Sequence, residues 1–330
     1  MSTARLPHPD RPALGHAVLD RRAELRARGW DALAGLPRRT MLLDGAAEAA
    51  VVRTSAGAHL HVDPDGPARP AGPTVPAGPG APADVDPPGG GALELFLGVD
   101  PQGVAVVARV APRPGAMPAE VTWEGLRRAG LVLPDVDREA LAEAVALANW
   151  HASHPRCPRC GSPTVPEGLG WWRTCPRDGS THFPRTDPAV IALLVDAGGN
   201  ALLGRQGRWP SGAFSTLAGF VEPGESAEAA VVREIREEVG LTPDSSTYVA
   251  SQPWPFPASL MLGYHARIAG DRPEPTVDGE EIVEARWVSR AELAQLCESE
   301  AVRLPGRLSI AHHLVTLWFG QRLPDSWCRW

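Results

Sequence analysis

The chain has 330 residues, more than a single compact domain usually holds, so at least two domains are expected. Its residues are 43% hydrophobic and 22% charged, which excludes a wholly disordered chain. A formal net charge of −7 argues against a general polyanion-binding protein, and no apolar run is long enough to cross a membrane. Because the N-terminus lacks the hydrophobic core of a signal peptide, a cytoplasmic location is expected.

Residues 1–150 are expected to form an α+β domain. A basic helix is predicted over Asp20–Trp30, and two strands joined by a turn over Leu93–Val99 and Val104–Val110. Apolar residues at helical spacing predict a further helix over Leu141–Trp150.

A Pro/Gly-rich insert interrupts this domain at residues 64–91. It consists almost entirely of Pro, Gly, Ala and Asp, which cannot bury a core, so a loop or linker is expected. Residues 151–186 are rich in Cys, Pro and Gly and are expected to form a small module.

Residues 187–330 are predicted to form a mixed α/β domain, and no internal repeat is obvious in the chain. Ser289 is a predicted helix N-cap. The predicted strands are Val190–Val195, Ala201–Gly204, Ser215–Val221, Thr247–Ala250, Leu260–Ile268 and Ile282–Val288, and the predicted helices are Arg290–Cys297 and Ser309–Gln321.

One further helix carries closely spaced acids. Ser226 is its predicted N-cap and Gly240 its left-handed C-terminal residue. Glu234, Glu237 and Glu238 stand at i, i+3 and i+4, so their carboxylates share one helix face. Bound Mg²⁺ or Mn²⁺ would remove the repulsion between them, because these cations prefer oxygen ligands. Three acids alone would equally fit a solvated helix surface.

The residues around these acids favour the metal site. Gly219, Glu225 and the run from Arg233 to Leu241 (REIREEVGL) resemble the Nudix box at every defined position. The resemblance implies a Nudix hydrolase domain, an α/β/α sandwich around a mixed sheet, with Glu225 and Arg233 bracing the box. It implies catalytic roles for Glu237 and Glu238, and Mg²⁺ or Mn²⁺ ligands at Ala218 (backbone carbonyl), Glu234, Glu237, Glu238 and Glu281.

The segment Ser251–Ser259 (SQPWPFPAS) alternates three prolines with two aromatic residues, which stiffens the backbone. A rigid loop that packs its aromatic rings inward is the structural alternative. The segment resembles the SQPWPFPxS signature of the NADH pyrophosphatase branch of Nudix enzymes. The resemblance implies hydrolysis of NADH or NAD⁺ to nicotinamide mononucleotide plus AMP, removal of NAD caps from RNA in some members, and a homodimer.

The same resemblance implies the substrate-binding residues. They are Phe183, Phe220, Gln252, Pro253, Trp254, Pro255, Phe256, Pro257, Ala258, Ser259 and Ala311.

Three alternatives stay open. The substrate is ADP-ribose or a nucleotide sugar, or the domain senses nucleotides without cleaving them, or NAD-capped RNA is the main substrate. For the last alternative, a basic strip is predicted from Arg156, Arg159, Arg173, Arg177 and Arg185.

Cys157, Cys160 and Cys175 have zinc-ribbon spacing, and Asp178 stands in the fourth ligand position. Asp178 can bind zinc, and the nearby His182 is a second candidate for that position. A module packed by its aromatic residues without metal is the alternative. A structural zinc ion is expected, with no catalytic role.

Overall fold

The computed structural model describes residues 11–15, 17–55, 57–62 and 92–328. The chain divides into two compact units. The C-terminal unit comprises Asp187–Trp254 and Ser259–Trp330, together with the segment that ends at Gly15. The N-terminal unit comprises His16–Thr186, together with Pro255–Ala258. The whole Pro/Gly-rich insert, residues 64–91, lies outside the described residues. Among the described residues, no helix combines the length and apolar character needed to span a membrane.

The C-terminal unit is built on a mixed sheet with strand order β13-β14-β10-β11-β15, and β12 also pairs with β10. β10 and β14 are parallel, and the other pairs are antiparallel. The strands are β10 (Asp187–Val195), β11 (Ala201–Gln206), β12 (Leu217–Phe220), β13 (Ser245–Trp254), β14 (Ser259–Arg267) and β15 (Ile282–Val288).

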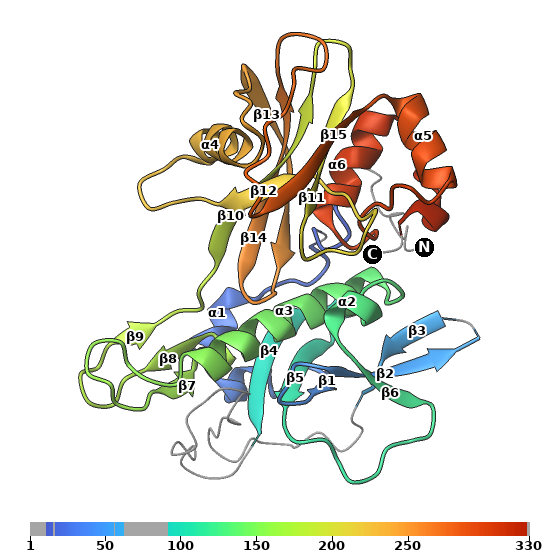
Figure 1. Cartoon of the computed structure of the whole chain (residues 1–330). Helices are drawn as coiled ribbons and strands as arrows, with labels where there is room; N and C mark the ends of the chain where they lie inside the picture. Colours follow the sequence, from blue (N-terminus) through green and yellow to red (C-terminus); the bar gives the residue numbers. More distant parts are fainter. Residues whose placement is uncertain (1–10, 16, 56, 63–91, 329–330) are drawn as a thin grey trace. The chain divides into compact units, whose positions relative to one another are not determined.

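Helices cover both faces of this sheet, as the sandwich prediction requires (Figure 1). Alternate residues of β10 point to opposite faces. Val190, Ala192 and Leu194 pack on the side of α4 (Ala227–Val239), while Ile191, Leu193 and Val195 pack on the side of α5 and α6. These two helices span Arg290–Glu298 and Ile310–Phe319, and a 3₁₀ turn, η3 (Asp325–Trp327), follows them.

The predicted helix ends are confirmed. The Ser226 hydroxyl accepts a hydrogen bond from the Ala229 amide at the start of α4, and Gly240 ends the helix at φ 69°. Ser289 begins α5 with a capping box to Glu292.

The N-terminal unit contains a second mixed sheet, with order β3-β2-β1-β5-β4 and β6 paired to β2. α3 (Asp135–Ser153), longer than the predicted helix, contacts β4 and β5 (Figure 1). The other elements are β1 (Arg38–Leu43), β2 (Ala49–Thr54), β3 (Gly57–Leu60), β4 (Leu93–Val99), β5 (Ala105–Val110), β6 (Val121–Glu124) and α2 (Leu126–Ala129).

The helix predicted over Asp20–Trp30 is wrong in extent. Only Ala23–Arg26 form a helix, α1, and a separate 3₁₀ turn, η1, covers Trp30–Leu33. Arg22 and Gly29 both have positive φ values, 42° and 73°, so the backbone leaves the helical region on either side of α1.

The two sheets repeat one arrangement, although no internal repeat is obvious in the sequence. In each, two antiparallel hairpins are joined by a central parallel pair, β2-β1-β5-β4 in the first and β11-β10-β14-β13 in the second. In the second sheet, β12 and α4 follow β11. In the first, β3 and the Pro/Gly-rich insert stand at that place in the chain, and the insert contains no glutamate.

Residues 152–186 form a small module with a three-stranded sheet. Its strands are β7 (Val165–Glu167), β8 (Trp172–Thr174) and β9 (Thr181–His182), with a 3₁₀ turn, η2, at Gly168–Gly170. Arg173 is buried, donates to the hydroxyl of Thr164 over 2.6 Å and to its carbonyl over 2.7 Å, and contacts the buried ring of His151. Arg173 is therefore structural and cannot belong to the predicted basic strip.

Candidate active site and metal centres

Glu238 is an acid that is buried in the C-terminal unit. Its side chain lies on the buried face of α4 and the residue is 2% exposed. Burial, and then the negative charges of Glu281 and Glu234, raise the pKa of its carboxyl to about 9. Neither carboxylate oxygen makes a hydrogen bond within the described residues, although the backbone of Ala218 lies close enough to favour the ionised form. A buried acid without a partner is costly, and a bound cation would offset this cost.

Arg233 connects the other acids of the box. Its Nε and Nη2 donate to Glu225 over 2.9 and 2.8 Å, and Nη2 also donates to the Phe220 carbonyl. Its Nη1 donates to Glu234 over 2.7 Å and to Glu237 over 3.0 Å. The arginine thus fastens the loop before α4 to the helix, which is the bracing role predicted for Arg233 and Glu225.

Gly219 has a steric reason to be glycine. A Cβ atom added there would lie 1.9 Å from the carboxyl carbon of Glu234. β12 therefore approaches α4 closely enough for the Glu234 carboxylate to occupy the space of a side chain. Burial raises the pKa of Glu234, and the charges of Glu237 and Glu281 act in the same direction.

Glu281 lies at the start of β15. The Gln206 amide donates to its carboxylate over 3.1 Å, and Arg208 donates to Gln206 over 2.8 Å. Asp278 accepts backbone hydrogen bonds from Glu281 and Ile282, which fixes the turn before β15. No sequence pattern pointed to Gln206 or Asp278, because their roles depend on pairing between strands distant in the chain.

The acids implied by the Nudix resemblance therefore share one electrostatic environment. The charges of Glu281 and Glu234 raise the pKa of Glu238, and the charge of Glu281 also raises the pKa of Glu234. Neither carboxyl oxygen of Glu238 has a hydrogen-bond partner among the described residues. Glu237 is 55% exposed and is held by Arg233. This donor set of hard oxygen atoms fits Mg²⁺ or Mn²⁺, as expected for a Nudix domain. Ala218, the fifth proposed ligand, lies on β12 opposite Ile191 of β10.

The Ser251–Ser259 segment is divided between the two units. Ser251–Trp254 form the end of β13, which is an edge strand and so tolerates Pro253. Pro255–Ala258 belong to the N-terminal unit, and Ser259 begins β14.

Gln252, one of the expected substrate-binding residues, has no exposed side-chain surface. It is fully buried, and its amide nitrogen donates to the Leu308 carbonyl over 2.7 Å. Its other amide atom, Oε1, is buried without a hydrogen bond among the described residues. Ala311 is also buried, in the first turn of α6.

Two proposed substrate-binding aromatic residues are exposed. Phe220, in the C-terminal unit, is 58% exposed, and Phe183, in the N-terminal unit, is 68% exposed. Both rings are accessible for stacking against a flat ligand.

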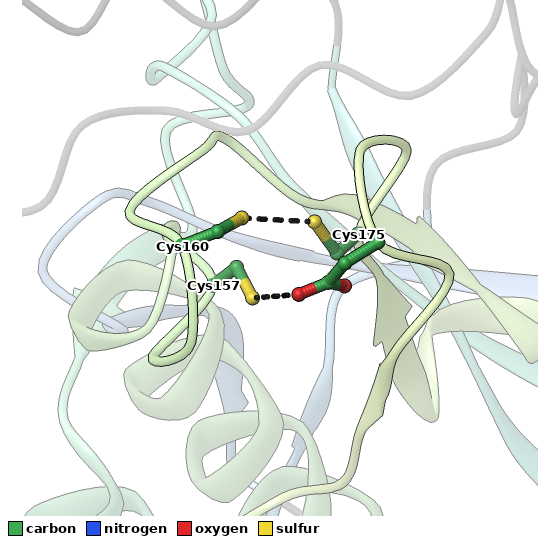
Figure 2. Close-up of side chains that lie close together, drawn as sticks. Cys157, Cys160 and Cys175 are labelled. Atoms are coloured by element: carbon green, nitrogen blue, oxygen red, sulfur yellow. Dashed lines mark hydrogen bonds between the residues drawn. The ribbon is translucent and has the colours of Figure 1, made fainter.

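The cysteine module forms a compact ligand set. The Sγ atoms of Cys160 and Cys175 lie 3.5 Å apart, and the Cys157 Sγ lies 3.4 Å from the Asp178 carboxylate (Figure 2). One ligand atom from each of these four residues lies within 4.8 Å of the others, a convergence found for no other group in the described parts of the chain. His182 is not in this group; its Nε2 lies 3.0 Å from the Ser180 hydroxyl.

The backbone of the module is suited to a metal. The turns after Cys157 and Cys175 are equivalent, since each cysteine carbonyl accepts from a glycine four residues later. Burial raises the pKa of the Cys157 thiol, but hydrogen bonds from Ser180 and the amides of the turn outweigh it and lower the pKa to about 6. Three thiolates and one carboxylate fit a structural zinc ion.

Comparison with known proteins follows this division of the chain. A family model described as a NUDIX domain matches residues 185–305. A model of the NADH pyrophosphatase zinc ribbon domain matches 152–183, and one of the NADH pyrophosphatase-like rudimentary NUDIX domain matches 42–150. The last match agrees with the repeated sheet arrangement.

Three curated relatives are similar over somewhat more than 60% of the chain. NAD-capped RNA hydrolase NudC of Mycobacterium bovis (strain BCG / Pasteur 1173P2) is 44% identical over 211 residues, which are 61% of this chain and 66% of the relative. NudC of Stutzerimonas stutzeri (strain A1501) is 43% identical over 63% of this chain and 72% of the relative. The mitochondrial NAD(P)H pyrophosphatase NUDT13 of Mus musculus is 40% identical over 61% and 60%. The chain thus spans just under two thirds of the mycobacterial relative.

Proposed function

The chain belongs to the NADH pyrophosphatase branch of the Nudix hydrolases, and on this premise we propose that it hydrolyses the diphosphate bond of NADH or NAD⁺. The products are reduced or oxidised nicotinamide mononucleotide and AMP. The observation that carries the proposal is the setting of Glu238, a buried carboxylate without a partner beside Glu234 and Glu281. A domain that only sensed nucleotides would have no need to maintain this costly arrangement.

We assign the Mg²⁺ or Mn²⁺ ligands to Glu234, Glu237, Glu238, Glu281 and the Ala218 carbonyl. A bound divalent cation offsets the charge of the diphosphate and makes a water molecule easier to deprotonate. Arg233 holds two of these carboxylates in position for the cation. The proton on Glu238 must leave before its carboxylate can bind the cation, because burial keeps the acid neutral at pH 7.

The reaction needs a base that is reached by water. We assign this role to Glu237 or Glu238, and the exposure of Glu237 favours it. Water attacks one phosphorus atom and gives up a proton to the base. A new P–O bond forms, the bond to the bridging oxygen breaks, and that oxygen leaves on the other nucleotide monophosphate.

Phe220 and Phe183 are proposed to contact the nicotinamide or its ribose. Their exposed rings support this proposal, because stacking needs an open aromatic face. Trp254, Phe256 and their neighbours in the Ser251–Ser259 segment are proposed to bind the dinucleotide on their sequence pattern. Gln252 is proposed to act through its buried Oε1 or by positioning Leu308 at the approach to α6.

Two other substrates are compared in the same test. ADP-ribose or a nucleotide sugar presents the same diphosphate without the nicotinamide. NAD-capped RNA presents it at the end of a polymer, and the two NudC relatives are named for that activity. The proposal also includes a cytoplasmic location and a homodimer, for which cell fractionation and sedimentation velocity are the measurements.

The experiment is incubation of the protein with NADH, ADP-ribose or NAD-capped RNA in the presence of Mn²⁺ or Mg²⁺, with mass detection of the products. We expect AMP and reduced nicotinamide mononucleotide from NADH, and much slower hydrolysis of ADP-ribose. Rapid cleavage of ADP-ribose without cleavage of NADH would overturn the proposed substrate.

A further inference from the structure

The zinc-binding module is basic, although the whole chain is acidic. Residues 151–186 contain five arginines and two acids, a formal charge of +3, whereas the chain carries −7. Arg173 is buried and takes no part in a surface, as described above. Arg156, Arg159 and Arg177 are exposed, and we refer to these three as the ribbon arginines.

The metal ligands bring these arginines together. Arg159 directly precedes Cys160, and Arg177 directly precedes Asp178. Because the ligand atoms of the two turns lie within 4.8 Å of one another, the two arginines stand on adjacent turns (Figure 2). Arg156 precedes Cys157 and donates to the carbonyl of Gly161 in the same turn.

The ribbon arginines are not used for ion pairs inside the module. In the described parts of the chain, none of the three lies within salt-bridge distance of a carboxylate outside the metal site. Glu167, the other acid of the module, accepts instead from Trp172 and Thr174. Exposed guanidinium groups that make no ion pair among the described residues suit the phosphates of a polyanion.

A short covalent link joins the module to the Nudix domain. β9 ends at His182 and β10 begins at Asp187, so four residues join the module to the central strand of the Nudix sheet. Such a link spans at most about 18 Å.

We propose that the ribbon arginines bind the phosphate backbone of single-stranded RNA that carries the dinucleotide at its 5′ end. The proposal rests on the proposed function and extends it from the free dinucleotide to capped RNA. Binding of this kind is independent of base sequence and weakens with salt. Free NADH has no following phosphates, so the ribbon arginines contribute nothing to its hydrolysis.

The test is the double substitution Arg159→Gln and Arg177→Gln. We expect unchanged kcat/KM for NADH, but a fall of about tenfold or more for NAD-capped RNA at low salt. Binding of an uncapped single-stranded RNA, followed by fluorescence anisotropy, should weaken equally, and its log–log salt slope should shrink by about 1.4, or 0.7 for each lost phosphate contact. The paired substitution to Lys should restore most of the binding.

A matched control removes two exposed arginines elsewhere, Arg128→Gln and Arg322→Gln, and should leave RNA binding unchanged. Zinc content is measured in every variant; if the double variant loses zinc, Arg156→Gln replaces it in the test. If the double variant binds RNA as tightly as the control variant does, the proposal is overturned. That result would mean that the ribbon arginines only offset the charge of the metal site or bind an acidic protein. Failure of the wild-type protein to cleave NADH would instead overturn the proposed function.

Discussion

Glu238→Gln is predicted to make the protein more stable and at the same time inactive. The pKa of Glu238 is about 9 in the folded chain, against an ordinary value of 4.5. An acid with a raised folded pKa stabilises the fold at low pH, and this stability is lost as the pH rises from 4.5 to about 9. At pH 7 the unfolded carboxyl is about 2.5 units above its pKa, so ionisation favours unfolding by roughly 3 kcal/mol. Glutamine cannot ionise and removes this loss.

The assay is guanidinium unfolding, followed by tryptophan fluorescence, without added Mg²⁺ or Mn²⁺. Glu238→Gln should exceed the wild type by about 3 kcal/mol at pH 7 and by less than 1 kcal/mol at pH 5. Added Mn²⁺ should stabilise the wild type and not the variant. Glu237→Gln is the matched control, since its exposed side chain should change the stability by about 1 kcal/mol or less. Equal stability of the two variants at pH 7 would refute the assignment of Glu238 as a buried, neutral acid.

Three further predictions concern other parts of the chain. Burial raises the pKa of Glu143 to about 8, so Glu143→Gln should reduce the loss of stability between pH 5 and 8 whether or not Mn²⁺ is present; an unchanged pH profile would contradict this. Gly219→Ala should lower kcat by at least about tenfold by displacing Glu234, whereas Gly125→Ala, with open space around it, should not. Purified protein should contain one zinc ion per chain; Asp178→Cys should keep it and Asp178→Ala should hold it more weakly, as elemental analysis after dialysis would show.

Local signals in the sequence predicted the helix that carries the acids. Ser226 marks the start of the helix because its side chain accepts a hydrogen bond from a backbone amide of the first turn. Gly240 marks the end because glycine readily adopts the left-handed backbone conformation found there. Glu234 and Glu238 are four residues apart, so they lie one turn apart on the same face of the helix.

Features that depend on distant contacts could not be predicted. Nothing near Arg173 in the sequence indicates that Thr164 and His151 surround its guanidinium group. Gln252 is likewise buried through a contact with Leu308, 56 residues later. The arrangement that the two sheets share could not be predicted, because a hydrophobic pattern indicates which residues form strands but not the order of the strands in a sheet.

The repeat also explains why only one of the two sheets bears a candidate active site. In the C-terminal unit, the segment after β11 supplies β12 and α4, which carry Gly219 and the box glutamates. The corresponding segment of the N-terminal unit contains residues 64–91, which have no glutamate and a composition that disfavours a helix. The N-terminal unit therefore has no counterpart of the box glutamates at that place in the chain.

The central claim is tested most directly by chromatography with mass detection after incubation of the purified protein with NADH and Mn²⁺. The structure and its relatives predict AMP and reduced nicotinamide mononucleotide in equal amounts, with turnover lost in Glu238→Gln. Intact NADH under these conditions, or undiminished turnover in Glu238→Gln, would contradict the assignment of this site.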